Sequence, residues 1–445
     1  MKHPLKNIID LQKKNIPVGI CSICSSNKLV IEAAMKRGLE LNTHVLIEAT
    51  ANQVNQYGGY TGMKPQDFRV YIEKIAGRMG FPMEKVILGG DHLGPLTWVH
   101  LNEAEAMVEA GVLIRQFVKA GFTKIHVDTS MRVADDDIGK PLSTEVIARR
   151  GAKLVQIAER AYEELLVENE NAMQPVYVIG SEVPIPGGAQ EEEEGVQVTR
   201  VADFNGTVDL FKRAFGEYGI EDSWEKVIAV VVQPGVEFGD DSIHEYDRRS
   251  AWTLTDALRD FPTIVLEGHS TDYQTPQKLK EMVEDGIAIL KVGPALTFAL
   301  REALFSLNRI ENELLQNDGE KASNLVENLE SVMMRNPSNW KKHYHGDEKK
   351  LRLSRKYSFS DRARYYIGIK EIEESIETLI GNLREQSIPL SLLSQYVPVQ
   401  YNKIRKGLIK NDPYDILLDS VVSVMDEYYY AVVPDTISTI KNNLS

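Results

Sequence analysis

The stretch Val86-Ile87-Leu88-Gly89-Gly90-Asp91-His92-Leu93-Gly94-Pro95 joins a short apolar run to glycines and to an adjacent acid and imidazole. The apolar run is typical of a buried strand, and the glycines let the backbone turn sharply and approach a ligand closely. Asp91 offers a group for proton transfer, and His92 offers a metal ligand. Chemistry placed directly after a buried strand is the arrangement of a barrel enzyme.

Further apolar runs of the same type alternate with longer segments of helical period along the chain. The predicted strands are 18–21, 45–47, 86–88, 124–127, 176–179, 227–232, 263–266 and 287–291. The predicted helices between and after them are 27–37, 65–77, 103–120, 143–168, 208–217, 247–259, 276–284 and 295–313. Eight strands, each followed by a helix, within about 315 residues predict an α/β fold, a closed (β/α)8 TIM barrel. An open doubly wound sheet is the alternative, but no G-x-G-x-x-G follows its first strand.

Past Asn317 the alternation stops, and helical patterns remain, most clearly at 361–383 and 413–430. Asn336-Pro337 and Asp412-Pro413 interrupt them, because proline ends or prevents a helix. We therefore expect a catalytic barrel over residues 1–316 and a mostly helical C-terminal extension over 317–445.

The composition is that of an ordinary globular protein, with 43% hydrophobic and 26% charged residues among 445. The formal net charge of −14 argues against a nucleic-acid binder, which would carry a basic face. This negative charge favours a small molecule as the substrate.

No apolar run approaches the ~20 residues that a membrane span needs, and Met1-Lys2-His3-Pro4 does not open a signal peptide. We therefore expect a cytoplasmic protein without a membrane partner. Cys21 and Cys24 are the only cysteines, which excludes a disulfide framework. We interpret them as buried thiols.

Polar residues follow every predicted strand, and barrel enzymes carry their sites at these strand ends. The candidate metal ligands are His92, Glu182, Gln233 and His269, which follow the third, fifth, sixth and seventh strands. Imidazoles with carboxylate and amide oxygens suit a divalent zinc, manganese, cobalt or nickel ion. Glu182 is either a ligand or a proton-transfer group. The other histidines considered, at positions 44, 100, 126 and 244, are assigned structural roles.

Four segments carry a resemblance to a known family: 89–95, 180–184, 267–272 and 361–366, with a further specific match at 48–56. They resemble the non-catalytic subunit of class II D-tagatose-1,6-bisphosphate aldolase, a family of which some members are labelled tagatose-6-phosphate kinase. The resemblance covers nearly the whole chain. Within the family the sequence looks most similar to metal-dependent D-tagatose (D-fructose) 4-epimerases of heat-loving bacteria.

The family is distantly similar to catalytic class II aldolases, which implies a barrel of class II aldolase type. Their barrel binds zinc through three histidines and uses the aspartate of an Asp-His pair as proton donor. By position the resemblance implies that Asp91 is that aspartate and that His92 and His269 are metal ligands. Gln233 stands where the remaining histidine is expected. Ser270-Thr271-Asp272 replaces phosphate-clasping glycines, and Asp272 would repel a phosphate.

The resemblance and the chemistry together predict divalent-metal-dependent C4 epimerisation of a ketohexose, D-fructose/D-tagatose or the 6-phosphates. Retro-aldol cleavage of C3–C4, rotation of the aldehyde and re-addition invert C4, with the metal as Lewis acid. Asp91 and Asp128 are the candidate proton-transfer groups, with Glu182 as a third. The alternative is a non-catalytic stabilising subunit of a class II tagatose-bisphosphate aldolase, or that aldolase itself. Neither a phosphate-binding kinase loop nor a dinucleotide fingerprint is present.

The remaining strand ends and the motif at 361–366 supply candidate contacts to the sugar. The predicted substrate-binding residues are Glu48, Gln53, Tyr60, Ser130, Glu237, Ser270, Lys291 and Arg362. Because the 361–366 motif is the part of the tail most like the family, we expect the C-terminal region to close over the barrel mouth. A sugar substrate is the expected small-molecule partner, and a second copy of the chain or an aldolase catalytic subunit stays open as protein partner.

Overall fold

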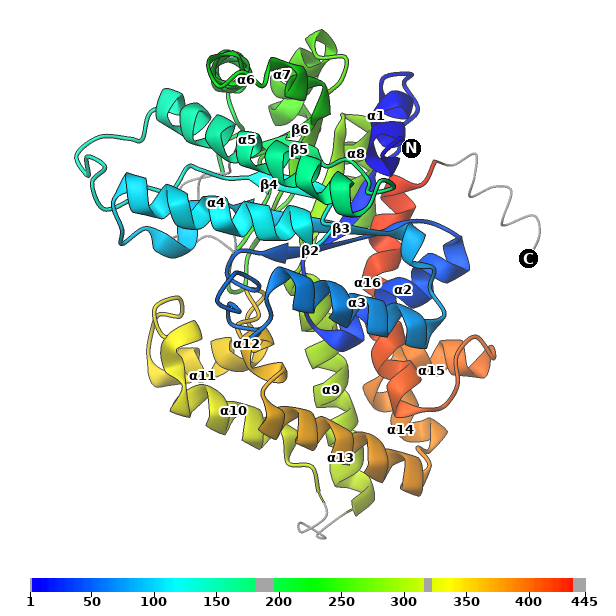
Figure 1. Cartoon of the computed structure of the whole chain (residues 1–445). Coiled ribbons are helices and arrows are strands. Elements are labelled where there is room, and N and C mark those ends of the chain that lie inside the picture. Colours follow the sequence, from blue (N-terminus) through cyan, green and yellow to red (C-terminus); the bar gives the residue numbers. More distant parts are fainter. Residues whose placement is uncertain (1, 181–195, 316–321, 435–445) are drawn as a thin grey trace.

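The computed structural model describes residues 2–180, 196–315 and 322–434. Its strands form a closed parallel barrel in the order β1-β10-β9-β6-β5-β4-β3-β2 (Figure 1). The strands are β1 (Ile20–Ile23), β2 (Val45–Thr50), β3 (Val86–Leu93), β4 (Lys124–Val127), β5 (Val176–Ile179), β6 (Val227–Val232), β9 (Val265–Gly268) and β10 (Ile287–Val292). The prediction of a (β/α)8 barrel is confirmed.

The predicted and observed strand bounds differ most at β3, which was expected to end at Leu88 but continues to Leu93. Gly89 and Gly90 do not end the strand, because they pair with Glu48 and Ala49 of β2. A Cβ at position 89 would lie 2.7 Å from the Glu48 side chain, so only glycine allows this close approach.

The barrel interior is layered, because alternate residues of each strand point inward. Ile20, Leu46, Val265 and Ile289 belong to a buried apolar cluster, which Leu5 and Ile9 of α1 (Pro4–Gln12) extend. Two positions further along the same strands stand Ser22, Glu48, Glu267 and Lys291, all buried. The apolar layer thus gives way to a charged layer toward the carboxyl ends of the strands.

Helices surround the barrel as predicted, but the sequence pattern places the start of α6 too late. They are α2 (Lys28–Leu41), α3 (Pro65–Met79), α4 (Glu103–Lys119), α5 (Thr144–Glu168), α6 (Val201–Glu217), α7 (Arg248–Ala257) and α8 (Pro276–Glu284). The α6 helix begins seven residues before the expected residue 208, because burial of Phe204 outweighs the weak helix propensity of Asn205 and Gly206. A small hairpin, β7 (Glu237–Phe238) and β8 (Ile243–His244), follows β6.

The last helix of the described residues completes the outer ring. Helix α9 (Pro294–Leu315) follows β10 and runs into the group of C-terminal helices, whereas α16 (Pro413–Val432) packs on α8, α2 and β1 (Figure 1). The backbone N–H of Gly19 donates to the carbonyl of Val432, which ties the end of α16 to the segment before β1. The division at 316/317 remains a prediction, and α16 belongs to the packing of the barrel.

The other C-terminal helices are α10 (Leu325–Arg335), α11 (Glu348–Tyr357), α12 (Arg364–Ile367), α13 (Lys370–Gln386), α14 (Leu390–Tyr396) and α15 (Pro398–Arg405). The single helix predicted over 361–383 is wrong: Asp361 has φ +43°, and the chain breaks again between α12 and α13. The Asp361 carboxylate accepts from Thr297 Oγ1 at 2.6 Å and Arg301 Nε at 3.0 Å, which holds this turn. Within the described ranges no helix has both the length and the apolarity that a membrane span requires.

Tyr428 of α16 offers a test of the ring closure. Its hydroxyl donates to the Thr271 carbonyl at 2.9 Å, in the loop after β9, and is buried. Tyr428→Phe removes this donor and leaves the carbonyl with the longer hydrogen bond from Gln274 N at 3.4 Å, and we expect a loss of about 1 kcal/mol in the free energy of unfolding by urea. Tyr430→Phe is the control, because the Tyr430 side chain is half-exposed. Equal stability of the two variants would contradict the role of this contact.

Candidate active site

The Asp91-His92 pair lies on a bulge of β3. Gly90 pairs with Ile125 of β4 and Leu93 pairs with Val127, so β3 uses one more residue than β4 over this span. His92 has φ +48°, a backbone conformation that is strained for a non-glycine residue and often found at functional sites. Bulges redirect side chains, and this one brings both residues against β4.

Three imidazoles meet at the carboxyl end of the barrel. The ring centroids of His92 and His126 are 4.9 Å apart, those of His92 and His269 are 5.1 Å apart, and those of His126 and His269 are 5.4 Å apart. His126 had been assigned a structural role, but the structure places it in the cluster. With Asp91, these histidines offer one ligand atom each, all within 4.8 Å of one another.

Each imidazole donates one ring N–H to a group that can only accept. His92 Nδ1 is 2.7 Å from the Asp128 carboxylate, His269 Nε2 is 3.0 Å from the Glu267 carboxylate, and His126 Nε2 is 3.0 Å from the Gly180 carbonyl. The lone pairs therefore lie on His92 Nε2, His269 Nδ1 and His126 Nδ1. Metal-bound histidines almost always show this outer hydrogen bond to a carboxylate or a carbonyl.

The pair formed by His126 and Asp91 also points to a cation. His126 Nδ1 accepts from the backbone N–H of His92 at 3.2 Å, yet it lies 2.9 Å from Asp91 Oδ1. With the proton on Nε2, both atoms of this contact carry lone pairs. A positive charge close to both atoms relieves their repulsion.

A buried ion network surrounds the histidines. Lys124 Nζ lies 2.7 Å from Glu48 Oε1 and 2.8 Å from Glu267 Oε2, and all three side chains are fully buried. Lys291 Nζ forms an ion pair with Asp91 Oδ1 and lies 3.8 Å from both Glu48 Oε2 and Glu267 Oε1.

The network has an excess of negative charge. Among the described residues, the lysine and arginine partners of Glu48, Asp91, Asp128 and Glu267 are Lys124 and Lys291, which leaves two negative charges when the imidazoles are neutral. Buried charges require compensation, and one divalent cation supplies it. Three imidazoles and a carboxylate suit zinc, manganese or cobalt. The residues therefore fit a divalent metal.

The charges also set the proton affinities. Burial alone would raise the pKa of Asp91, but His92 and Lys291 hold it well below its usual range. Burial and the nearby Lys291 charge lower the pKa of His269 to about 3, which keeps this imidazole neutral. Burial lowers the pKa of His92, but Asp91 and Asp128 outweigh it and raise the pKa above the usual value.

Gln233 and Glu182 were also predicted as metal ligands. Gln233 Oε1 accepts from the backbone N–H of Gly235 at 2.8 Å and of Val236 at 2.9 Å, so this oxygen is engaged in the turn after β6. His126 replaces Gln233 in the candidate ligand set. Glu182 belongs to 181–195, outside the described ranges.

Some of the other predicted site residues lie beside the histidine cluster, and others lie in the segments after β6 and β9. Glu48 and Lys291 belong to the ion network, and Ser130 Oγ donates to Asp128 Oδ1 at 2.6 Å, behind His92. Ser270 is buried with φ +51°, and Glu237 Oε1 accepts from its neighbour Phe238 at 3.0 Å.

A pocket of about 290 Å³ lies between the barrel and the C-terminal helices. Its lining includes Ser25, Gln53, Tyr60, Thr61, Arg364 and Tyr365. The rings of Tyr60 and Tyr365 meet edge to face at 5.2 Å. Gln53 and Tyr60 were predicted to bind substrate, and both line this pocket, as does Arg364, whereas Arg362 is not in its lining. Both guanidinium groups lie over the Tyr365 ring, Arg362 at 5.7 Å and Arg364 at 4.6 Å.

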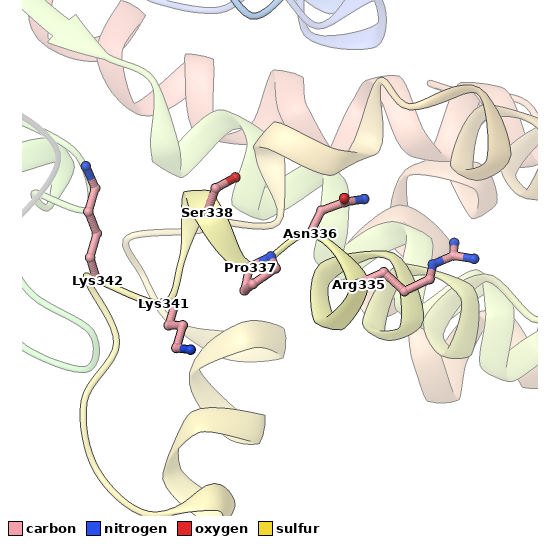
Figure 2. A pocket seen from close by; sticks show the side chains of 6 residues that line it. All are labelled: Arg335, Asn336, Pro337, Ser338, Lys341 and Lys342. Atoms are coloured by element: carbon pink, nitrogen blue, oxygen red, sulfur yellow. The ribbon is translucent and has the colours of Figure 1, made fainter.

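A second hollow, of about 480 Å³, lies entirely in the C-terminal region and is lined by residues 335–338, 341 and 342. Figure 2 shows the side chains of Arg335, Lys341 and Lys342 pointing in separate directions. Its lining contains neither an acid nor an imidazole. It is therefore a weaker candidate for chemistry than the histidine cluster.

Residues 5–433 match the family described as D-tagatose-1,6-bisphosphate aldolase subunit GatZ/KbaZ-like. Because the match covers nearly the whole chain, this protein belongs to that family.

The chain is also similar to solved structures. A probable tagatose 6 phosphate kinase from Sinorhizobium meliloti 1021 is 43% identical, with a TM-score of 0.85 over 93% of this chain and 100% of that one. The fructose-bisphosphate aldolase of Campylobacter jejuni is 15% identical, with a TM-score of 0.45 over 86% of this chain and 92% of that one. The YdjI aldolase of Escherichia coli K12 is 11% identical, with a TM-score of 0.39 over 86% and 96%.

His126 gives the sharpest test of the ligand set. We expect His126→Ala to weaken Co²⁺ or Zn²⁺ binding by more than the roughly 10- to 100-fold that loss of an outer hydrogen-bond partner causes. Equilibrium titration of the metal-stripped chain and elemental analysis measure the effect. His100→Ala is the control, because His100 is exposed. Wild-type metal affinity in His126→Ala would contradict the assignment.

Glu237 predicts a pH dependence of stability. Burial raises its pKa from 4.5 to about 7, so the folded chain favours the neutral acid. The stabilisation is present below about pH 4.5 and is lost as the pH rises through about 7. Relative to Glu237→Gln, the wild type should lose at most about 3 kcal/mol of unfolding free energy between pH 5 and 8. Urea unfolding measures this, with exposed Glu217→Gln as control. A gap that does not change with pH would exclude the effect.

Proposed function

We propose that this chain catalyses metal-dependent aldol chemistry on a ketose sugar. In this chemistry the C3–C4 bond is broken or formed, where C3 is the carbon next to the C2 carbonyl. The observation that carries the proposal is the buried cluster of Asp91, His92, His126 and His269. It brings together imidazole nitrogens that can bind a divalent cation and a carboxylate beside them. Membership in an aldolase subunit family supports it.

Asp91 is suited to move the proton that the reaction requires. A divalent cation bound by the three imidazoles would supply a Lewis acid that polarises the sugar carbonyl. The Lys291 ammonium beside Asp91 favours its ionised form, so the carboxylate can accept the proton of the substrate hydroxyl as the C3–C4 bond breaks. The same carboxyl returns the proton when the bond forms again.

Asp128 is better suited to position His92 than to move protons. Its Oδ2 accepts from His92 Nδ1 at 2.7 Å, and its Oδ1 accepts from Ser130 Oγ at 2.6 Å and Ser130 N at 3.0 Å. With both oxygens engaged, Asp128 fixes the ring and its tautomer. The role first given to Asp128, as second proton-transfer group, is therefore the weaker interpretation.

C4 epimerisation of D-fructose, D-tagatose or their 6-phosphates is the narrower form of the proposal. It requires that the aldehyde fragment rotate in place and that a proton be handled on its other face. Lys291 is the remaining charged group beside Asp91, and its ammonium can donate there. Interconversion of the two ketoses without release of fragments would distinguish epimerisation from net cleavage.

A second candidate function is that of a subunit without turnover. The ion pair between Lys291 and Asp91 favours it, because this pair engages the carboxylate that the chemistry needs. The family description also names a subunit. In that case the cluster holds a metal or a sugar, and a separate aldolase subunit performs the reaction.

The test is an assay of the purified chain alone with D-fructose, D-tagatose and their phosphates, with and without Mn²⁺, Co²⁺, Ni²⁺ or Zn²⁺. We expect metal-dependent turnover, and we expect Asp91→Asn to lower its rate by roughly 10²–10⁴-fold, the usual worth of a positioned acid or base. Asp209→Asn is the control, because Asp209 is exposed on α6. Full activity of Asp91→Asn, or of a preparation shown to be metal-free, would contradict the proposal. Turnover only after addition of an aldolase subunit would support the second candidate.

A further inference from the structure

The loop after β9 and the start of α9 meet at the place where (β/α)8 barrels usually bind phosphate. There, backbone N–H groups at a helix start point at an anion. In this chain the N–H groups of Gly293 and Ala295 donate to Asp272 Oδ1, at 3.0 Å and 2.8 Å. The Asp272 carboxylate thus already occupies the two amides that a phosphate would use.

Asp272 is held in this position by the loop around it. It is only 3% exposed, and its neighbours Ser270 and Tyr273 have φ +51° and +65°. Such conformations persist in non-glycine residues only where the surroundings enforce them. Thr271 supplies that constraint, since its hydroxyl donates to the Lys291 carbonyl at 2.6 Å and its carbonyl accepts from Tyr428.

The pocket of about 290 Å³ adjoins this place. Its residue Cys24 lies against Gly293, where a Cβ would be 3.1 Å from the Cys24 carbonyl oxygen, and Thr297 of α9 also lines it. Cys24 also joins the pocket to the barrel, because its N–H donates to the Val292 carbonyl at 2.9 Å and its Sγ lies 3.9 Å from the Ser22 hydroxyl, which donates to Glu48.

The lining of the pocket suits hydroxyl groups. Serine, threonine, tyrosine, asparagine and glutamine side chains dominate, and the two charged residues of the lining, Arg364 and Glu373, have opposite signs. The terminal nitrogens of Arg364 already donate to the carbonyls of Ser360 and Asp361 and to the Tyr365 hydroxyl. Because of these contacts, the guanidinium is poorly placed to bind a phosphate through two parallel hydrogen bonds.

We propose that Asp272 determines specificity: it excludes a phosphate from the barrel's usual phosphate site, so that the substrate end lying in the adjoining pocket is an uncharged polyol. This inference rests on the proposed function for the identity of the substrate as a sugar. A phosphate at the start of α9 would meet a buried carboxylate of the same sign, and it would have to displace that carboxylate from both amides.

The test uses the full chain and the conservative variant Asp272→Asn, whose amide oxygen can still accept from both N–H groups. We expect the wild type to bind an unphosphorylated ketose and to show no thermal stabilisation by inorganic phosphate. Removal of the charge should shift the ratio of affinities toward the phosphorylated ketose by on the order of tenfold or more. Asp272→Gly, which also frees the amides, should gain stabilisation by inorganic phosphate.

Asp412→Asn is the matched control, because Asp412 caps Tyr414 N at 2.9 Å and Asp415 N at 3.3 Å at the start of α16. An unchanged affinity ratio in Asp272→Asn would overturn the inference, and so would phosphate-dependent stabilisation of the wild type that Asp272→Asn does not alter. Because binding is measured without turnover, an inactive chain that shows the expected shift would refute the proposed function alone.

Discussion

The ion network inside the upper half of the barrel is the constraint on which the rest of the structure depends. Lys124 bridges Glu48 and Glu267 with all three side chains fully buried, and charges in such surroundings are stable only when each is paired. The pairing fixes β2, β4 and β9 relative to one another. If apolar side chains filled the barrel at the carboxyl ends of its strands, the core would be more stable, but it would bind neither a cation nor a sugar.

The histidine cluster extends this network toward the barrel mouth. Glu267 both pairs with Lys124 and orients His269, and Asp128 orients His92. The C-terminal part of the chain then supports the site from outside. Asp361 joins the segment before α12 to Arg301 of α9, and the Tyr273 hydroxyl donates to the Phe359 carbonyl at 2.6 Å. The loop after β9 is therefore held by both α16 and the segment before α12.

Sequence patterns identify the barrel because buried strands and amphipathic helices leave strong local signals. They also single out Asp91, His92 and His269, which stand at strand ends and lie together in the structure. They miss His126 because it lies within β4, where a polar residue was taken for a structural one. The alternation of Lys124 and His126 was the available signal, since both positions face inward. Gln233 stands at a strand end as well, and no sequence pattern indicates that its side-chain oxygen accepts hydrogen bonds from its own turn. The place of α16 in the ring leaves no local signal, because it depends on contacts far apart in the chain.

We propose that one divalent ion, held by His92, His126 and His269, balances the negative charge left over in the barrel. The most direct test is X-ray diffraction from crystals of the metal-loaded chain, collected on both sides of the absorption edge of the metal. The account predicts a single strong anomalous peak per chain, within coordination distance of nitrogens of all three imidazoles. A peak bound elsewhere, or metal-loaded crystals without a peak between these rings, would contradict it.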